Sequence, residues 1–149
     1  MSGAQAIGER LEALYRALAE GPMAGLPICN PHLGVAALGF REVGGEAVGI
    51  VVTPWFLNLV AAPLRPAAPA QVGETRKLAL PAGELDLIVG ELPGFGRLDA
   101  ASLVSPMFEF ADMQAALGAA EGALAALFAR PPPRGLDRRA FLSGRAAGA

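Results

Sequence analysis

Residues 35–61 read VAALGFREVGGEAVGIVVTPWFLNLVA, and this stretch decides the fold. Two largely apolar segments, 35–43 and 46–53, flank the pair Gly44-Gly45. A two-residue hairpin turn favours such a pair because both of its central residues need positive φ. Val48, Ile50 and Val52 alternate along the second segment and so share one face of a strand. The stretch therefore predicts an antiparallel β-hairpin.

Further strands are predicted on the C-terminal side of this hairpin. Pro54 ends the second strand, because proline lacks the N–H that a central ladder needs. A second hairpin is indicated by Pro81-Ala82-Gly83, which suits a type I turn. The predicted strands beyond the first hairpin are residues 56–61, 76–80, 84–91 and 97–104.

Helical periodicity appears at both ends of the chain. Ile7, Leu11, Leu14 and Leu18 recur at spacings of four and three, and Ser2 with Gln5 can form a capping box. A second apolar stripe runs from Asp112, a suitable N-cap, to Phe128. Short connections between the strands favour antiparallel pairing. The sequence predicts an α+β fold, a mainly antiparallel sheet of about five or six strands with an N-terminal and a C-terminal helix covering one face.

Length and composition favour one domain without nucleic-acid or membrane partners. We expect residues 1–130 to form a single α+β domain, and residues 131–149, which begin with three prolines, to form a linker and short tail. A net charge of −2 provides no attraction for nucleic acid. The longest apolar run, 47–64, contains two prolines and is shorter than the roughly 20 residues of a membrane span. Charged residues near the N-terminus speak against a secretory signal, so we expect no membrane insertion and a cytoplasmic location.

Few residues of the chain are candidates for catalysis or for metal binding. The chain has one cysteine, Cys29, and one histidine, His32, and no Gly-x-Ser-x-Gly nucleophile motif. A structural zinc site needs four ligands, usually cysteine or histidine. We therefore predict no catalytic residue, no metal and no cofactor, and expect that the chain is not an enzyme. A small ligand- or metal-binding module that uses the Cys29/His32 loop stays open as the alternative, and a hydrolase with an unrecognised site is a third.

Three segments are candidates for binding a protein partner: Thr53 to Asn58, Gly90 to Gly94, and Ser102 to Phe108. The first and the last place proline immediately before large apolar residues where a strand should end, and aromatic side chains and methionine on loops are typical anchors. A fourth candidate is Arg138-Arg139-Ala140-Phe141-Leu142, which looks like the core of a twin-arginine export signal but lies close to the C-terminal end, where we expect no export activity. Core positions for Trp55 and Phe108, and a plain basic helical turn for the fourth segment, stay open. The predicted partner-binding residues are Pro54, Trp55, Phe56, Pro106, Met107, Phe108, Arg138 and Arg139.

The order of several short segments resembles the HybE/HupJ family of [NiFe]-hydrogenase assembly chaperones. The segments are Asn30-Pro31, residues 49–63 around Thr53-Pro54-Trp55, Arg76-Lys77, Gly90-Glu91-Leu92, residues 102–107, and the Arg138 to Leu142 string followed by Gly144-Arg145. The resemblance implies a cytoplasmic accessory protein and not an enzyme. It also implies a chaperone that binds the large-subunit precursor, the small-subunit precursor or both, before twin-arginine export. Some members carry a rubredoxin domain, whose iron needs four thiolates; with one cysteine, this chain is expected to be the chaperone module alone.

Overall fold

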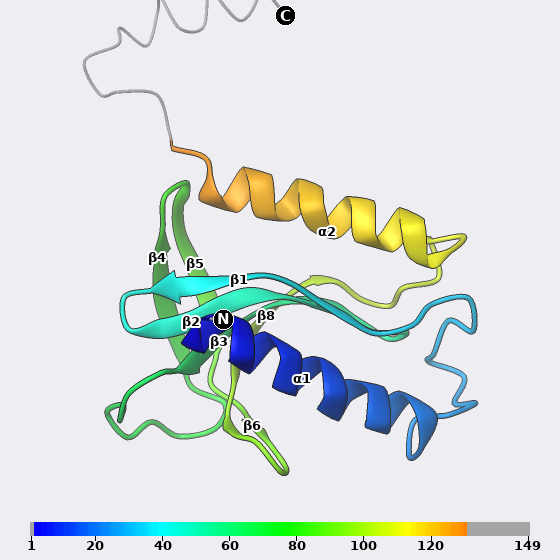
Figure 1. Cartoon of the computed structure of the whole chain (residues 1–149), viewed down its shortest axis with the longest axis horizontal. Coiled ribbons are helices and arrows are strands. Elements are labelled where there is room, and N and C mark those ends of the chain that lie inside the picture. Colours follow the sequence, from blue (N-terminus) through cyan, green and yellow to red (C-terminus); the bar gives the residue numbers. More distant parts are fainter. Residues whose placement is uncertain (1, 131–149) are drawn as a thin grey trace, which may run out of the picture.

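The computed structural model describes residues 2–130 and arranges them as a sheet with two helices (Figure 1). The predicted linker and tail, 131–149, lie outside the described residues. In chain order the elements are α1 (Gly3–Glu20), β1 (Ala36–Val43), β2 (Glu46–Val52), β3 (Leu57–Pro63), β4 (Thr75–Leu80), β5 (Gly83–Ile88), β6 (Glu91–Leu92), β7 (Gly96–Arg97), β8 (Asp99–Val104) and α2 (Met113–Phe128). Neither helix of the described part of the chain is both long and apolar enough to cross a bilayer.

The main sheet has six strands in the order β1-β2-β3-β8-β5-β4, and every pairing is antiparallel. The predicted α+β fold is thereby confirmed. Gly44 and Gly45 form the turn between β1 and β2 with φ of 56° and 83°, as a two-residue hairpin requires. β1 and β4 are the two edge strands, and the short strands β6 and β7 pair only with each other.

Both helices begin as their sequences predict. The Ser2 hydroxyl accepts a hydrogen bond from the N–H of Gln5 at 3.1 Å, and the Gln5 side chain accepts one from the N–H of Ser2 at 3.0 Å. This capping box satisfies N–H groups that have no partner within the helix. Asp112 caps α2 by accepting from the N–H of Ala115 at 2.9 Å.

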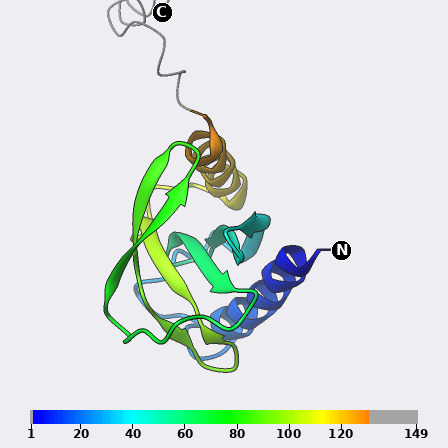
Figure 2. The same cartoon turned by 90° about the vertical axis from the view of Figure 1, so that its left-hand side faces the viewer.

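The two helices lie on opposite faces of the sheet, so the prediction that both cover one face is wrong (Figure 2). Val51 of β2 packs with Leu11 and Tyr15 of α1. Ile50 and Val52, the neighbours of Val51, pack instead against α2. Successive strand side chains point to opposite faces, and both faces of β2 are covered, which explains why residues 47–52 are buried without interruption.

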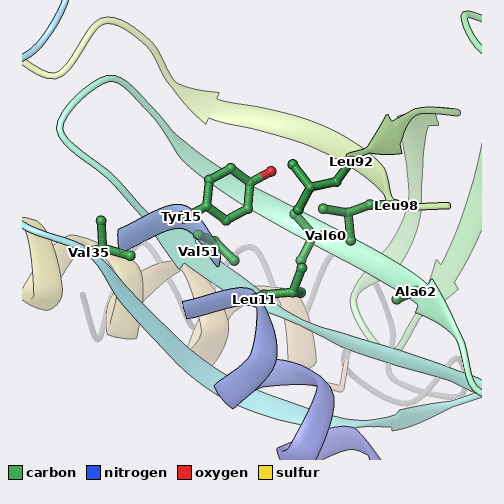
Figure 3. Packing of buried hydrophobic residues seen from close by; sticks show 8 residues of the cluster. All are labelled: Leu11, Tyr15, Val35, Val51, Val60, Ala62, Leu92 and Leu98. Atoms are coloured by element: carbon green, nitrogen blue, oxygen red, sulfur yellow. The ribbon is translucent and has the colours of Figure 1, made fainter. Parts of the chain in front are cut away.

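The strands predicted at 84–91 and 97–104 are each shorter than expected. The chain leaves the sheet at Gly90, whose carbonyl accepts from the N–H of Leu98 at 3.0 Å. A Cβ at position 90 would stand 2.8 Å from the Leu98 carbonyl oxygen, so only glycine permits this approach. The excursion forms β6 and β7 and brings Leu92 and Leu98 to Val60, in the cluster beneath α1 (Figure 3).

Candidate functional site

Three loops meet at one end of the sheet, which we call the loop end: residues 21–35, 53–56 and 105–112 (Figure 1). The first joins α1 to β1, the second joins β2 to β3, and the third joins β8 to α2. The antiparallel order of the sheet brings these connections together, although they are far apart in the sequence. Two of the predicted partner-binding segments, those around Trp55 and Phe108, lie here.

Asn30 holds the three loops together. Its side chain is buried, with 3% of the residue exposed. Its Nδ2 donates to the carbonyls of Met107 at 3.0 Å and Phe110 at 2.9 Å. Its backbone N–H donates to the Pro54 carbonyl at 2.9 Å, and its Oδ1 accepts from the N–H of His32 at 2.9 Å. Sequence reasoning did not place Asn30 among the site residues; its position beside Pro31, in a segment that carries the family resemblance, was the only signal.

The turn between β2 and β3 is closed by the Thr53 hydroxyl, which accepts from the N–H groups of Trp55 at 3.2 Å and Phe56 at 3.0 Å. Both aromatic rings turn toward α1 and pack on Tyr15, with ring centroids 6.4 Å and 5.4 Å away. Burial raises the pKa of the Tyr15 hydroxyl. Pro54 is buried, and Trp55 and Phe56 are half-buried. The two aromatics therefore contribute to the core while keeping part of their surface accessible.

The loop from 105 to 110 separates the other three predicted residues. Met107 is fully buried, at 0% exposure, among residues of the α2-side core. The Met107 side chain therefore adds no exposed surface to the loop end, and its role as a partner contact stays a prediction. Pro106 is exposed, and Phe108 is 54% exposed.

The loop end also exposes aliphatic side chains. Leu26 and Ile28 are 42% and 47% exposed on the loop that contains Asn30. A groove of about 330 Å³ adjoins them, between the end of α1 and Pro54. Apolar side chains of Met23 and Leu33 line it, together with Cys29. The groove is also lined by the charged residues Arg16 and Glu20, so the loop end combines exposed apolar side chains with a groove of mixed character.

Cys29 and His32 do not form a metal site with their described surroundings. The Cys29 thiol donates to the Met23 carbonyl at 3.3 Å, and His32 is exposed. Within residues 2–130, no group of three or more His, Cys, Asp or Glu side chains is placed to hold a metal ion.

The most connected charged group lies at the opposite end of the sheet. The buried Asp99 carboxylate accepts from Arg76 Nε at 2.6 Å and from Arg97 Nη2 at 3.0 Å, and Arg76 also pairs with Glu46. Burial raises the pKa of Asp99, but the hydrogen bonds from Arg97 and Arg76 outweigh it and hold the pKa below its ordinary value. Because each charge is paired, this cluster links β2, β4 and β8 and offers no reactive group.

Comparison with known proteins agrees with the sequence resemblance. Residues 6–144 match the profile of a family described as "[NiFe]-hydrogenase assembly, chaperone, HybE". The hydrogenase expression/formation protein HupJ of Bradyrhizobium diazoefficiens is 43% identical over 95% of this chain and 89% of its own length. HupT of Azotobacter chroococcum is 41% identical over 95% of this chain and 97% of its own. The solution structure of HybE from Escherichia coli superimposes with a TM-score of 0.66 at 25% identity, covering 88% of this chain and 85% of that chain. Arg138 and Arg139 lie outside the described residues.

Proposed function

Because this chain belongs to the HybE family of [NiFe]-hydrogenase assembly chaperones, we propose that it binds hydrogenase precursor subunits through its loop end. The partner is the large-subunit precursor, the small-subunit precursor or both, bound in the cytoplasm during maturation and before twin-arginine export. In this proposal the chain holds its partner and performs no chemistry. The observation that carries it is the convergence of three loops on Asn30, two of which expose large apolar side chains.

The surface has the properties that recognition of an unassembled subunit requires. Exposed apolar side chains that lie close together mark interaction sites, whereas scattered ones are ordinary. Leu26, Ile28 and Phe108 stand on the two loops that Asn30 joins. Because Asn30 and the Thr53 turn fix the loop backbones, these anchors are ordered before a partner arrives. Such preorganisation lowers the entropic cost of binding.

Half-buried aromatics in the turn between β2 and β3 belong to the same end of the sheet. Trp55 and Phe56 keep part of their rings accessible while Tyr15 holds them in place. Trp and Tyr dominate the energetics of many protein interfaces, whose central residues are surrounded by contacts that exclude water. We infer that Trp55 lies toward the centre of the interface and that Pro106 and Phe108 lie on the adjoining loop. Arg138 and Arg139 remain predicted partner contacts.

A pair of isoleucines tests the proposal. Ile28 at the loop end and Ile88 at the end of β5 are similarly exposed, at 47% and 58%. Ile28→Ala and Phe108→Ala are each expected to weaken capture of hydrogenase precursor by the tagged full chain by about fivefold or more, as loss of an anchor does. Ile88→Ala, with the same truncation on another surface, is the matched control and should leave capture unchanged.

The readout is precursor recovered per mole of tagged chain from hydrogenase-expressing cells, with thermal unfolding run on each variant to confirm the fold. Both target residues are exposed, so their truncation is expected to change stability little. If Ile28→Ala and Phe108→Ala bind as Ile88→Ala does, the loop end is not the interface. A metal or small molecule bound to the native protein in mass spectrometry would instead favour the Cys29/His32 alternative.

A further inference from the structure

A second groove lies away from the loop end, between α1 and the edge strand β1. Its volume is about 480 Å³. Gln5, Glu9 and Glu12 of α1 line one side, and Ala37, Gly39 and Phe40 of β1 line the other. No strand pairs with the outer edge of β1, and side chains of α1 approach this edge instead. An extended chain that displaces the Glu12 contact with the Ala37 N–H would meet both backbone and side chains here.

The Phe40 ring forms an apolar floor, and two glycines make room for it. A Cβ at Gly8 of α1 would stand 2.8 Å from the ring, and a Cβ at Gly49 of β2 would stand 2.4 Å from it. Real Cβ atoms do not approach so closely, so the ring occupies space that side chains at both positions would fill. The floor is consequently fixed in place, and Phe40 stays half-buried beneath the groove.

The walls carry negative charge that is only partly neutralised. The Glu12 carboxylate accepts from the outward N–H of Ala37 at 2.8 Å and pairs with Arg16 at 3.3 Å. The Glu12 carboxylate oxygen takes the position in which the carbonyl of an added strand would accept a hydrogen bond from the Ala37 N–H. The Ala37 N–H therefore faces the groove. Glu9 is exposed, and no basic side chain within residues 2–130 forms an ion pair with it. The groove suits an extended segment with paired positive charges and apolar side chains.

We propose that the occupant is the chain's own C-terminal segment, with Arg138 and Arg139 beside Glu9 and Glu12 and with Phe141 and Leu142 over Phe40. Residues 131–149 carry four arginines and one aspartate, opposite in sign to the groove walls. The string Arg138 to Leu142 supplies adjacent charges followed by large apolar residues, the order that the groove accommodates. Strand addition at a sheet edge is a common way to bind an extended peptide.

The last turns of α2 contact β1, the strand that lines the groove, from the other face of the sheet. Phe128, in the last turn of α2, lies under Arg41 of β1, with 4.0 Å between the Arg41 Cζ and the ring centroid. A Cβ at Gly39, which lines the groove, would stand 2.6 Å from a methyl carbon of Leu124. The seven residues 131–137 precede Arg138 and begin with three prolines, so in extended form they span about 20 Å at ~3.1 Å per residue. In this proposal the seven residues carry the chain from the end of α2 around the edge of β1.

This inference deepens the proposed function, and the biological meaning of tail docking rests on that function. The segment from Arg138 to Leu142 looks like the core of a twin-arginine signal. In the groove, the tail would therefore mimic such a signal from within the same chain. Docking itself needs no precursor and is measured without one. Lost docking with intact precursor capture would overturn only the inference, and intact docking without capture would overturn only the proposed function.

Paramagnetic relaxation enhancement in the full chain tests the docking. A nitroxide is attached at Gly144→Cys in a Cys29→Ser background, where serine can keep the hydrogen bond to the Met23 carbonyl. Amides of Gly8, Ala37 and Gly39 should broaden several times more than that of Ile88 on the far hairpin. Glu9→Gln, or the pair Arg138→Gln with Arg139→Gln, should lower the docking equilibrium constant about twofold to fivefold, the size expected for exposed charge pairs. Glu20→Gln on the same helix removes an equal charge outside the groove and is the control.

Docking is supported if the groove amides broaden and if the Glu9 and arginine variants reduce that broadening while Glu20→Gln does not. It is overturned if the groove amides broaden no more than Ile88. It is also overturned if Glu9→Gln has no effect, or if Glu20→Gln lowers the broadening equally, because attraction would then be unspecific. Glu9 is exposed, so its substitution is expected to leave the fold intact.

Discussion

Asn30→Ala removes the side chain that joins the 21–35 loop to the 105–112 loop, and its cost can be worked from the structure. The backbone hydrogen bond from position 30 to Pro54 is retained. The Met107 carbonyl loses a buried donor at 3.0 Å, and a buried polar group left unpaired costs about 2 kcal/mol. The Phe110 carbonyl and the His32 N–H lose partly buried partners, for which water can substitute in part, at ~0.5 kcal/mol each. The expected loss is about 3 kcal/mol of the free energy of unfolding.

Urea unfolding followed by Trp55 fluorescence measures this loss, because Trp55 is the only tryptophan and lies in the turn that Asn30 contacts. A loss of this size lowers the urea midpoint by about 1–2 M for ordinary m-values. Asn58→Ala is the matched control: within residues 2–130 the Asn58 Oδ1 is buried without a hydrogen-bond partner, so its removal should cost much less. Equal losses for the two variants would refute the role assigned to Asn30.

Other substitutions probe the packing, the charge cluster and the helix cap. Gly49→Ala should cost about 1–3 kcal/mol in thermal or urea unfolding, because the new Cβ would stand 2.4 Å from the Phe40 ring; Gly118→Ala on α2, with open space around it, should be neutral or stabilising. Asp99→Asn should cost about 3 kcal/mol at pH 7. Since the folded pKa of Asp99 is lowered, its stabilisation is lost as the pH falls through that pKa, and wild type and variant should converge progressively below about pH 4 in unfolding series. Ser2→Ala should cost about 1 kcal/mol in the same assay, and no loss would mean that the cap does not stabilise α1.

The local elements of the fold could be predicted because each has a short-range signal. Gly44-Gly45 needs positive φ at both positions, and Ser2 with Asp112 marks the helix starts; all three features are confirmed. The side of the sheet that each helix covers has a weaker signal. Residues 47–52 form a continuous apolar run, which is typical of a strand covered on both faces, but strict alternation at Val48, Ile50 and Val52 had favoured one covered face.

Long-range arrangement could not be predicted from the pattern. β8 lies between β3 and β5, yet its register with β5 is a single pair, Ile88 with Ala100, so little in either strand specifies the neighbour. Met107 and Phe108 are adjacent apolar loop residues that look alike in sequence. Met107 is buried and Phe108 exposed, and the Met107 carbonyl accepts a hydrogen bond from Asn30, 77 positions away, a contact that no local pattern indicates.

Hydrogen exchange on the complex of the full chain with purified hydrogenase precursor tests most directly where the partner binds. The loop end contains backbone N–H groups in residues 21–35 and 105–112 that a bound subunit would cover. We predict slower exchange of these amides in the complex, with the β4–β5 hairpin unchanged. Protection confined to that hairpin, or to no part of the loop end, would contradict the account.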